Sequence, residues 1–388
     1  MSGMGLSMQQ LLLNWMLIGM LLLPAGQVGL IQAVIGIPGV ALILLGGVRA
    51  DHSDPRNFLI IVYLVAPVFP LFLIGMDQLG YFTVWAVTLW GLGISFVQAY
   101  SAPAQQAILN RVTGRDVQKG VTAATIFAYV VQVVALALAG QMDRLGITPV
   151  LFAQGLSLAL AAWAMTRISQ VASTAIAVRA GAWQDFVDGL RATYRDKVIL
   201  HVLIINFVSS IFNAGSFFTV FPFVVKRIYA GDALLLSVLM VIFFLGAALS
   251  NVVLLRFMPL RRPGRLYLLV QLTRTIVLFM IYVQGDLWLM VLATFGWGLN
   301  MGITSNLARA IVQESAQPAY LGRILSVFTV GLVGSAPIGA IILGWLIETV
   351  GTLNALWPAM MLSVLLFFYG IWRTDVWRYE SGAQQSSN

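Results

Sequence analysis

One arginine, Arg274, lies near the middle of a long apolar stretch of the sequence. Charge inside hydrocarbon is costly, so a charged residue there usually serves a function or faces other polar groups. Arg265 begins the same stretch, and at about 1.5 Å per helical residue Arg274 lies roughly 13 Å deep. Two explanations stay open. Arg274 is a candidate contact for an anionic substrate group, or carbonyls and hydroxyls such as those of Thr273 and Thr275 satisfy it.

Polar and aromatic side chains also recur at helical spacing within four other apolar stretches. Amides and aromatic faces in an apolar cavity suit bulky amphipathic compounds. The alternative is that these side chains join neighbouring helices to one another. The residues are Gln10 and Asn14 near 3–23, Trp90 and Gln98 near 80–102, Asn206, Ser210, Asn213 and Phe217 near 198–225, and Trp297, Asn300 and Thr304 near 287–308.

The composition requires these stretches to lie in a membrane. Hydrophobic residues make up 60% of the 388 and charged residues 9%, whereas soluble domains carry roughly 25% charged residues. Apolar runs of about 20 residues are long enough to cross the bilayer as helices. We therefore predict an all-α polytopic membrane protein with about twelve spans, near 3–23, 28–48, 58–76, 80–102, 120–141, 148–167, 198–225, 233–255, 266–284, 287–308, 323–347 and 354–372.

Basic residues predict the orientation. Arg144, Lys226 and Arg227 fall on one face of the membrane, and the remaining Lys and Arg outside the spans fall on the other. The positive-inside rule then places both termini in the cytoplasm, in a plasma or bacterial inner membrane. Because the basic residues border spans and form no separate domain, the net charge of +8 does not indicate nucleic-acid binding.

The longest polar gap divides the spans six and six. Within it Trp183, Phe186, Leu190 and Tyr194 share one helical face, which predicts an amphipathic helix on the membrane surface; a disordered linker is the alternative. We expect a six-helix bundle over 1–168, a cytoplasmic linker over 169–197, a second bundle over 198–373 and a cytoplasmic tail over 374–388. The polar end, Tyr379–Asn388, predicts disorder.

Residues for catalysis or metal binding are sparse. Cysteine is absent, and the two histidines, His52 and His201, lie far apart, so we expect neither a metal site nor a cofactor. A phosphate-binding loop for ATP is also missing. A membrane transferase would need acids, bases or metal ligands clustered near one face, so we predict that the protein is not an enzyme.

The loop after the second span, Gly47–Arg56 (Gly-Val-Arg-Ala-Asp-His-Ser-Asp-Pro-Arg), resembles a loop of the major facilitator superfamily. Its pattern is Gly-x-Leu-Ala-Asp-Arg-x-Gly-Arg-Arg, which Gly47, Ala50, Asp51 and Arg56 match. Departures from the pattern are Arg49, His52, Asp54 and Pro55.

Three further stretches resemble the enterobactin-exporter-like and macrolide-efflux-like branch of that superfamily. They are Pro103–Ala107, Trp183–Asp196, and Leu321-Gly322-Arg323 with Pro337-Ile338-Gly339. Two features common in drug–proton antiporters are missing, namely a Gly-Pro pair in span 5 and an arginine within span 4. The superfamily resemblance implies two six-helix bundles.

The resemblance also implies roles for particular residues. Asp51 would accept hydrogen bonds at the start of span 11, after Gly322 and Arg323, and would form with Gly47 and Arg56 a latch that holds one conformation. The alternative is that Asp51 and Arg56 only mark a turn. Spans 1, 4, 7 and 10 would line the substrate cavity, whereas span 9, which carries Arg274, usually packs outside it.

Together these observations predict a secondary transporter that works by alternating access and exports amphipathic, drug- or siderophore-like molecules. Its expected partners are a small-molecule substrate, membrane lipids and protons, and we expect a monomer. Coupling to protons usually needs an acid within the membrane. Asp51, in the loop after the second span, is the one acid for which we expect a conformational role. A lipid or lysolipid flippase and a transporter-like sensor without flux remain alternatives.

Overall fold

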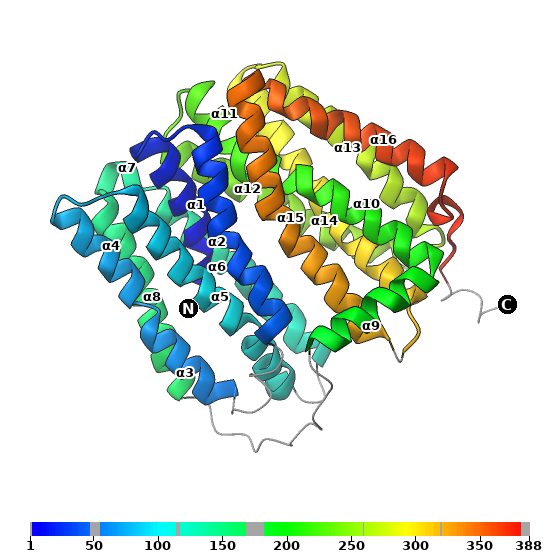
Figure 1. Ribbon diagram of the computed structural model, residues 1–388, viewed down its shortest axis with the longest axis horizontal. Helices are drawn as coiled ribbons and strands as arrows, with labels where there is room; N and C mark the ends of the chain where they lie inside the picture. Colours follow the sequence, from blue (N-terminus) through cyan, green and yellow to red (C-terminus); the bar gives the residue numbers. More distant parts are fainter. Residues whose placement is uncertain are drawn as a thin grey trace. The chain divides into compact units, whose positions relative to one another are not determined.

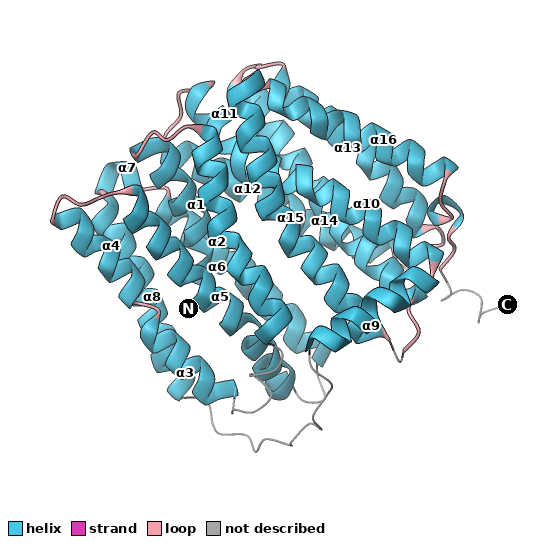
Figure 2. Ribbon diagram, in the orientation of Figure 1, coloured by secondary structure: helices cyan, strands magenta, loops and turns pink. Residues whose placement is uncertain are grey.

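The computed structural model describes residues 2–46, 55–113, 117–167, 182–258, 260–318 and 320–381. Over these ranges the chain forms helices joined by short loops, with no strand (Figure 2). Helices satisfy every backbone hydrogen bond within the segment itself, as the interior of a bilayer requires.

The chain forms two compact units. The first contains Met1–Pro24, Ile31–Trp183 and Ala230–Val238, and the second contains Ala25–Leu30, Gln184–Tyr229 and Leu239–Asn388. Each unit therefore includes one short segment from the other half of the sequence.

In the first unit, α1 packs against α6 and α8, while α3 and α4 pack against α5 and α8 (Figure 1). Its elements are α1 (Ser2–Trp15), a π turn (Met16–Met20), most of α2 (Ala25–Gly46), α3 (Pro55–Val65), α4 (Val68–Gln78), α5 (Val84–Thr113), α6 (Val117–Ala139), α7 (Met142–Leu145) and α8 (Ile147–Thr166).

In the second unit, α10 packs against α14, α15 and α16, and α13 packs against α14 and α16 (Figure 1). Its elements are α9 (Ala182–Arg195), α10 (Lys197–Gly215), a π turn (Ser216–Val220), α11 (Phe221–Arg227), most of α12 (Ala233–Phe257), α13 (Pro263–Tyr282), α14 (Leu287–Ser315), α15 (Leu321–Val350), a 3₁₀ turn (Asn354–Leu356), α16 (Trp357–Trp372) and a second 3₁₀ turn (Val376–Arg378).

Within the described residues, nine helical segments are long and apolar enough to cross a membrane. They begin at Ala25, Arg56, Ile147, Lys197, Ala233, Pro263, Leu287, Leu321 and Asn354. The other predicted spans correspond to α1 with its π turn, to α5 and to α6. The prediction of an all-α polytopic membrane protein is confirmed.

The first and seventh spans each contain a π turn, at Met16–Met20 and Ser216–Val220. A π turn inserts one residue into the α-helical repeat, and such turns occur frequently at functional sites. A regular 3.6-residue pattern does not predict them. In the seventh span the π turn shifts the side chains after Gly215, including Phe217, relative to those before it.

The predicted amphipathic helix is α9, so a disordered linker is excluded for residues 182–195. Its Tyr194 and Leu190 side chains are 68% and 39% exposed. Asp196 ends the segment and caps α10, because its carboxylate accepts hydrogen bonds from the N–H groups of Val198 and Ile199 at 2.9 and 3.0 Å. Such a cap satisfies two of the free donors at a helix start.

The prediction of disorder after residue 378 is wrong for Tyr379–Ser381. The guanidinium of Arg262 binds the Glu380 carboxylate at 2.6 Å, and that hydrogen bond and positive charge lower the pKa of the carboxyl. The Ser381 N–H donates to the carbonyl of Arg261 at 3.1 Å. Composition alone missed these contacts because their partners lie more than a hundred residues earlier in the sequence.

Helices α10 and α15 approach so closely that their backbones touch. A Cβ atom on Gly215 would lie 2.6 Å from the carbonyl oxygen of Gly339, and one on Gly339 would overlap the carbonyl oxygen of Ile211. Small residues allow this kind of contact between membrane helices.

We therefore expect Gly339→Ala to lower the apparent Tm in detergent, because separating the two backbones costs about 1–3 kcal/mol. Gly331→Ala on the same helix is the matched control. A Cβ there meets only Phe207, at an ordinary 3.5 Å, so its apparent Tm should stay level or rise. Equal Tm values for the two variants would contradict the close contact.

Candidate functional site

The residues predicted to form the latch are only partly covered by the structure. Gly47 and Asp51 lie outside the described residues. Arg56, in the first turn of α3, donates to the carbonyl of Thr166 at the end of α8 at 2.8 Å and to Asn57 at 3.2 Å. A cation at a helix C-terminus is stabilised by the helix dipole, so in this structure Arg56 joins two helices of the first unit.

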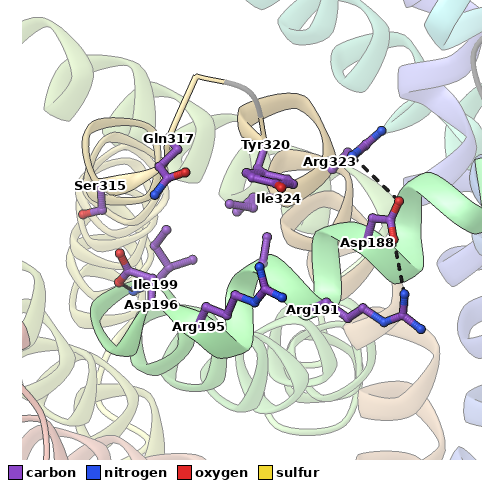
Figure 3. A pocket seen from close by; sticks show the side chains of 11 residues that line it. Asp188, Arg191, Arg195, Asp196, Ile199, Ser315, Gln317, Tyr320, Arg323 and Ile324 are labelled. Carbon is purple, nitrogen blue, oxygen red and sulfur yellow. Dashed lines mark hydrogen bonds and ion pairs between the residues drawn. The ribbon is translucent and has the colours of Figure 1, made fainter.

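Arg323 lies in the first turn of α15 and pairs with the linker helix. Its guanidinium is 3.7 Å from the carboxylate of Asp188 on α9, and the same carboxylate lies 3.6 Å from Arg191 (Figure 3). The Arg323 guanidinium also lies 6.0 Å from the ring centre of Tyr320. Two stretches that the sequence marked independently, Trp183–Asp196 and Leu321–Arg323, are therefore side by side.

A glycine sets the distance between these two helices. A Cβ atom on Gly189 would overlap the backbone carbonyl of Arg323 and lie 3.1 Å from the Val327 side chain. Since the ion pair at Asp188 is partly exposed and such pairs contribute little, backbone contact at Gly189 is the stronger constraint on how α9 packs on α15. A Cβ atom on Gly322 would meet no atom within 4 Å, so Gly322 does not set the distance between the two helices.

A pocket of about 370 Å³ opens beside this contact, entirely within the second unit. It is formed by α9, the start of α10, the end of α14 and the start of α15. Its walls carry three arginines, two aspartates and several neutral polar groups (Figure 3). The residues are Asp188, Arg191, Ala192, Arg195, Asp196, Ile199, Ser315, Gln317, Tyr320, Arg323 and Ile324.

Deeper in the second unit, the polar and aromatic residues predicted near 198–225, here called the α10 stripe, meet those predicted near 287–308 on α14. The indole N–H of Trp297 donates to the side-chain oxygen of Asn213 at 2.7 Å. Phe217 stacks on Phe243 at 4.0 Å between ring centres and meets Trp297 edge-on at 5.4 Å. Phe221 stacks on Phe217 and meets Trp297 edge-on. The result is an aromatic cluster that a single amide, that of Asn213, contacts.

Arg274 is buried among neutral polar groups rather than paired with a carboxylate. It lies on α13, 3% exposed, and donates to the Ser209 hydroxyl on α10 and, at 3.4 Å, to the Asn300 side-chain oxygen on α14. The Asn300 amide in turn donates to the Val270 carbonyl at 2.6 Å and to Thr273 at 2.9 Å.

The partners proposed from sequence for Arg274 were wrong. The Thr273 hydroxyl donates to the carbonyl of Val270, and the Thr275 hydroxyl donates to that of Met360. Thr275 faces another helix, α16, whereas Thr273 reaches the cluster only through Asn300, whose amide donates to its hydroxyl at 2.9 Å. Ser209 and Gln271, which hydrogen-bond to each other at 3.1 Å, complete the buried cluster.

The remaining stripe residues of the second unit differ in how they are bonded. Thr304 donates to the carbonyl of Asn300 within its own helix at 2.8 Å. Asn206 is buried, Ser210 is half-buried, and neither makes a hydrogen bond to a residue that the structure describes. Ser210 is therefore the more accessible polar group on this stripe.

In the first unit, two of the predicted residues join helices. The Asn14 side-chain oxygen accepts from Gln32 at 2.7 Å. The Trp90 indole donates to Gln154 at 3.1 Å, and Gln154 donates to the carbonyl of Gly5 at 2.9 Å. Gln98 is exposed, and its side chain makes no hydrogen bond within the described part of the chain. The alternative that such residues join helices thus holds for Asn14 and Trp90.

The sequence profile of a family described as transmembrane secretion effectors, of the major facilitator type, matches residues 1–388. The chain belongs to this family. The transporter is also similar in structure to two solved transporters at low sequence identity, which shows the shared fold. No match to its sequence was found among curated proteins.

The first of these structures is the nucleoside transporter NupG, with a TM-score of 0.78, 14% identity, and coverage of 97% of this chain and 98% of that one. The second is a bacterial homologue of the human lysosomal transporter Spinster, with a TM-score of 0.67, 12% identity, and coverage of 97% and 94%. The transporter therefore has the major facilitator fold. Its branch within that superfamily is not distinguished by these matches.

Several residues of the transporter were missed by sequence reasoning. Ser209 and Gln271 contact or adjoin Arg274, and Asp188 and Arg195 line the pocket. A signal existed for Gln271, because it and Tyr267 lie one and two turns before Arg274 on the same helix face. None existed for Ser209, whose partner is 65 residues away.

Proposed function

We propose that the protein is a secondary transporter that exports amphipathic small molecules by alternating access, with both termini in the cytoplasm. The observation that carries this proposal is the match of the whole chain to the transmembrane secretion effector family. The uneven distribution of Lys and Arg supports the orientation, because short cytoplasmic loops carry the excess of basic residues.

The interior of the second unit supports the kind of substrate. Aromatic rings of the π turn at Ser216–Val220, of α12 and of α14 pack together there, and one amide, Asn213 of α10, contacts them. Such a surface favours molecules with a large apolar body and a few hydrogen-bonding groups. Gln98 and Ser210 are the candidate polar contacts, since most other predicted residues already bond to protein groups.

The surroundings of Arg274 do not favour an anionic substrate. Its guanidinium is surrounded by Ser209 and Asn300 within the unit, so an anion would have to displace protein contacts. We propose that Arg274 holds α10, α13 and α14 together.

The proposal is tested by proton movement in everted membrane vesicles that contain the transporter, followed with a pH-sensitive dye. The compounds are lipophilic cations, neutral macrolide-like amphiphiles and anionic catecholates. We expect a proton efflux that depends on one of these classes. Asp51→Asn should reduce it by as much as about 30-fold, because loss of a helix-terminus contact worth up to about 2 kcal/mol shifts the conformational balance.

Asp54→Asn is the matched control, because it removes a carboxylate from the same loop at a position where the family pattern has glycine. A proton signal that survives in Asp51→Asn would contradict the latch. If no compound moves protons, counterflow of labelled compound tests uncoupled transport, and movement of fluorescent lipid tests the flippase alternative. Failure of all three would leave the sensor alternative and refute transport.

A further inference from the structure

The pocket beside α9 has a surplus of positive charge. Arg191, Arg195 and Arg323 line it, against Asp188 and Asp196. Asp188 is shared between Arg191 and Arg323 at 3.6 and 3.7 Å. The Asp196 carboxylate is occupied by the N–H groups at the start of α10. Both acids therefore already have partners.

Arg195 has no such partner. It is exposed in the last turn of α9, and it makes no ion pair or hydrogen bond with any residue that the structure describes. Figure 3 shows Arg195, Gln317 and Tyr320 on different sides of the same opening. A guanidinium beside an amide and a phenol offers several hydrogen-bond donors to one oxyanion, and arginine is well suited to phosphate.

The surroundings of the pocket indicate where such an anion would come from. Leu190 and Tyr194 of α9 are exposed, although the helix is strongly amphipathic. An amphipathic helix with arginines on its polar face binds at the membrane surface and is attracted to anionic lipids. Ile199 and Ile324 add an apolar wall to the pocket, which suits the glycerol and first acyl carbons of a lipid.

We propose that this pocket binds a phosphate-bearing anion through Arg195, with Gln317 and Tyr320 as neutral donors. The shared chemistry is a phosphate ester with net negative charge. Its source is either the headgroup of an anionic phospholipid in the surrounding bilayer or a soluble phosphate ester. The site is separate from the transported substrate, so it does not depend on what the transporter exports.

The test uses the full-length protein purified in detergent. Binding of short-chain phosphatidylglycerol, short-chain phosphatidylcholine and glycerol phosphate is measured by titration of intrinsic tryptophan fluorescence and by the shift in apparent Tm. We compare the wild type with Arg195→Gln. We expect the variant to bind phosphatidylglycerol about tenfold more weakly, as expected for the loss of one charge-assisted hydrogen bond.

Arg256→Gln is the matched control. Arg256 is another exposed arginine in the last turn of a helix, α12, and does not line the pocket. This variant should bind as the wild type does. Because both positions are exposed, neither change should prevent folding, and the apparent Tm without added ligand verifies this.

The results separate the two sources. Binding of phosphatidylglycerol alone, weakened in Arg195→Gln, identifies a lipid headgroup site. Binding of glycerol phosphate with the same dependence on Arg195 identifies a site for soluble phosphate esters. Equal binding of phosphatidylcholine and phosphatidylglycerol, unchanged binding in Arg195→Gln, or no binding by the wild type would each overturn the proposal.

Discussion

Replacing Asn300 by leucine is expected to make the transporter too unstable to purify as a single folded species. Asn300 accepts hydrogen bonds from Arg274 and donates to Val270 and Thr273. Without its oxygen, Arg274 would keep Ser209 as its one remaining partner among the described residues. Taking a hydrogen-bond acceptor away from a buried charge costs more than the about 1–3 kcal/mol that is usual for a neutral polar group, which is a large share of the stability of most proteins. Monodisperse yield and apparent Tm measure the loss.

The matched control is Asn306→Leu, on the same helix. Asn306 also donates two hydrogen bonds, to Asn251 at 2.6 Å and to the carbonyl of Gly302 at 3.0 Å, and both of these partners are neutral. Its loss should cost about 1–3 kcal/mol, the usual penalty for unpaired polar groups. If Asn300→Leu is as stable as Asn306→Leu, the charge of Arg274 is not what Asn300 satisfies.

A double variant, Arg274→Met with Asn300→Leu, separates structure from function. Replacing a buried charge together with its polar partner by apolar residues is often neutral for stability, so the double variant should recover yield and apparent Tm. Transport by the recovered protein then has two informative outcomes. Normal transport supports a purely structural role for Arg274, and loss of transport in a stable protein shows that the charge serves the transport cycle.

The helices could be predicted from sequence because the bilayer leaves few choices. Long apolar runs must become helices, and the period of Trp183, Phe186, Leu190 and Tyr194 was enough to predict α9. The amphipathic pattern needs only local information, as does the cap at Asp196, which precedes α10 directly.

The contacts between helices could not be predicted in the same way. Arg274 was singled out correctly as a buried charge, yet its partners lie on α10 and α14, 65 and 26 residues away. Which helix faces lie together depends on packing across the whole unit. The π turn at Ser216–Val220 adds a further difficulty, since the shift that it introduces leaves no mark in hydrophobic periodicity. Composition likewise could not show that the stretches around Gly189 and Arg323 pack together.

Replacing Gly189 by leucine is expected to detach α9 from α15 and to slow transport by about fivefold or more. The added side chain would overlap the backbone of Arg323, and overpacking of this kind costs about 1–3 kcal/mol. A cost of about 1–3 kcal/mol corresponds to a drop of about 5-fold to 150-fold in the population of the docked helix. Since α9 lies in the segment that we predict to link the first six and the last six spans, its docking on α15 is a candidate control point for the transport cycle.

Detachment can be measured separately from transport because the natural chain contains no cysteine. A single cysteine at Ala192, which is half-buried in the wall of the pocket, should react faster with a maleimide when Gly189→Leu is also present. Gln184→Leu is the matched control, since it adds the same side chain at an exposed position of α9. Unchanged thiol reactivity in Gly189→Leu would refute the backbone contact itself. Faster reaction with normal transport would instead mean that α9 covers the pocket without governing the transport cycle. The ion pair between Asp188 and Arg323 would then only hold α9 against α15.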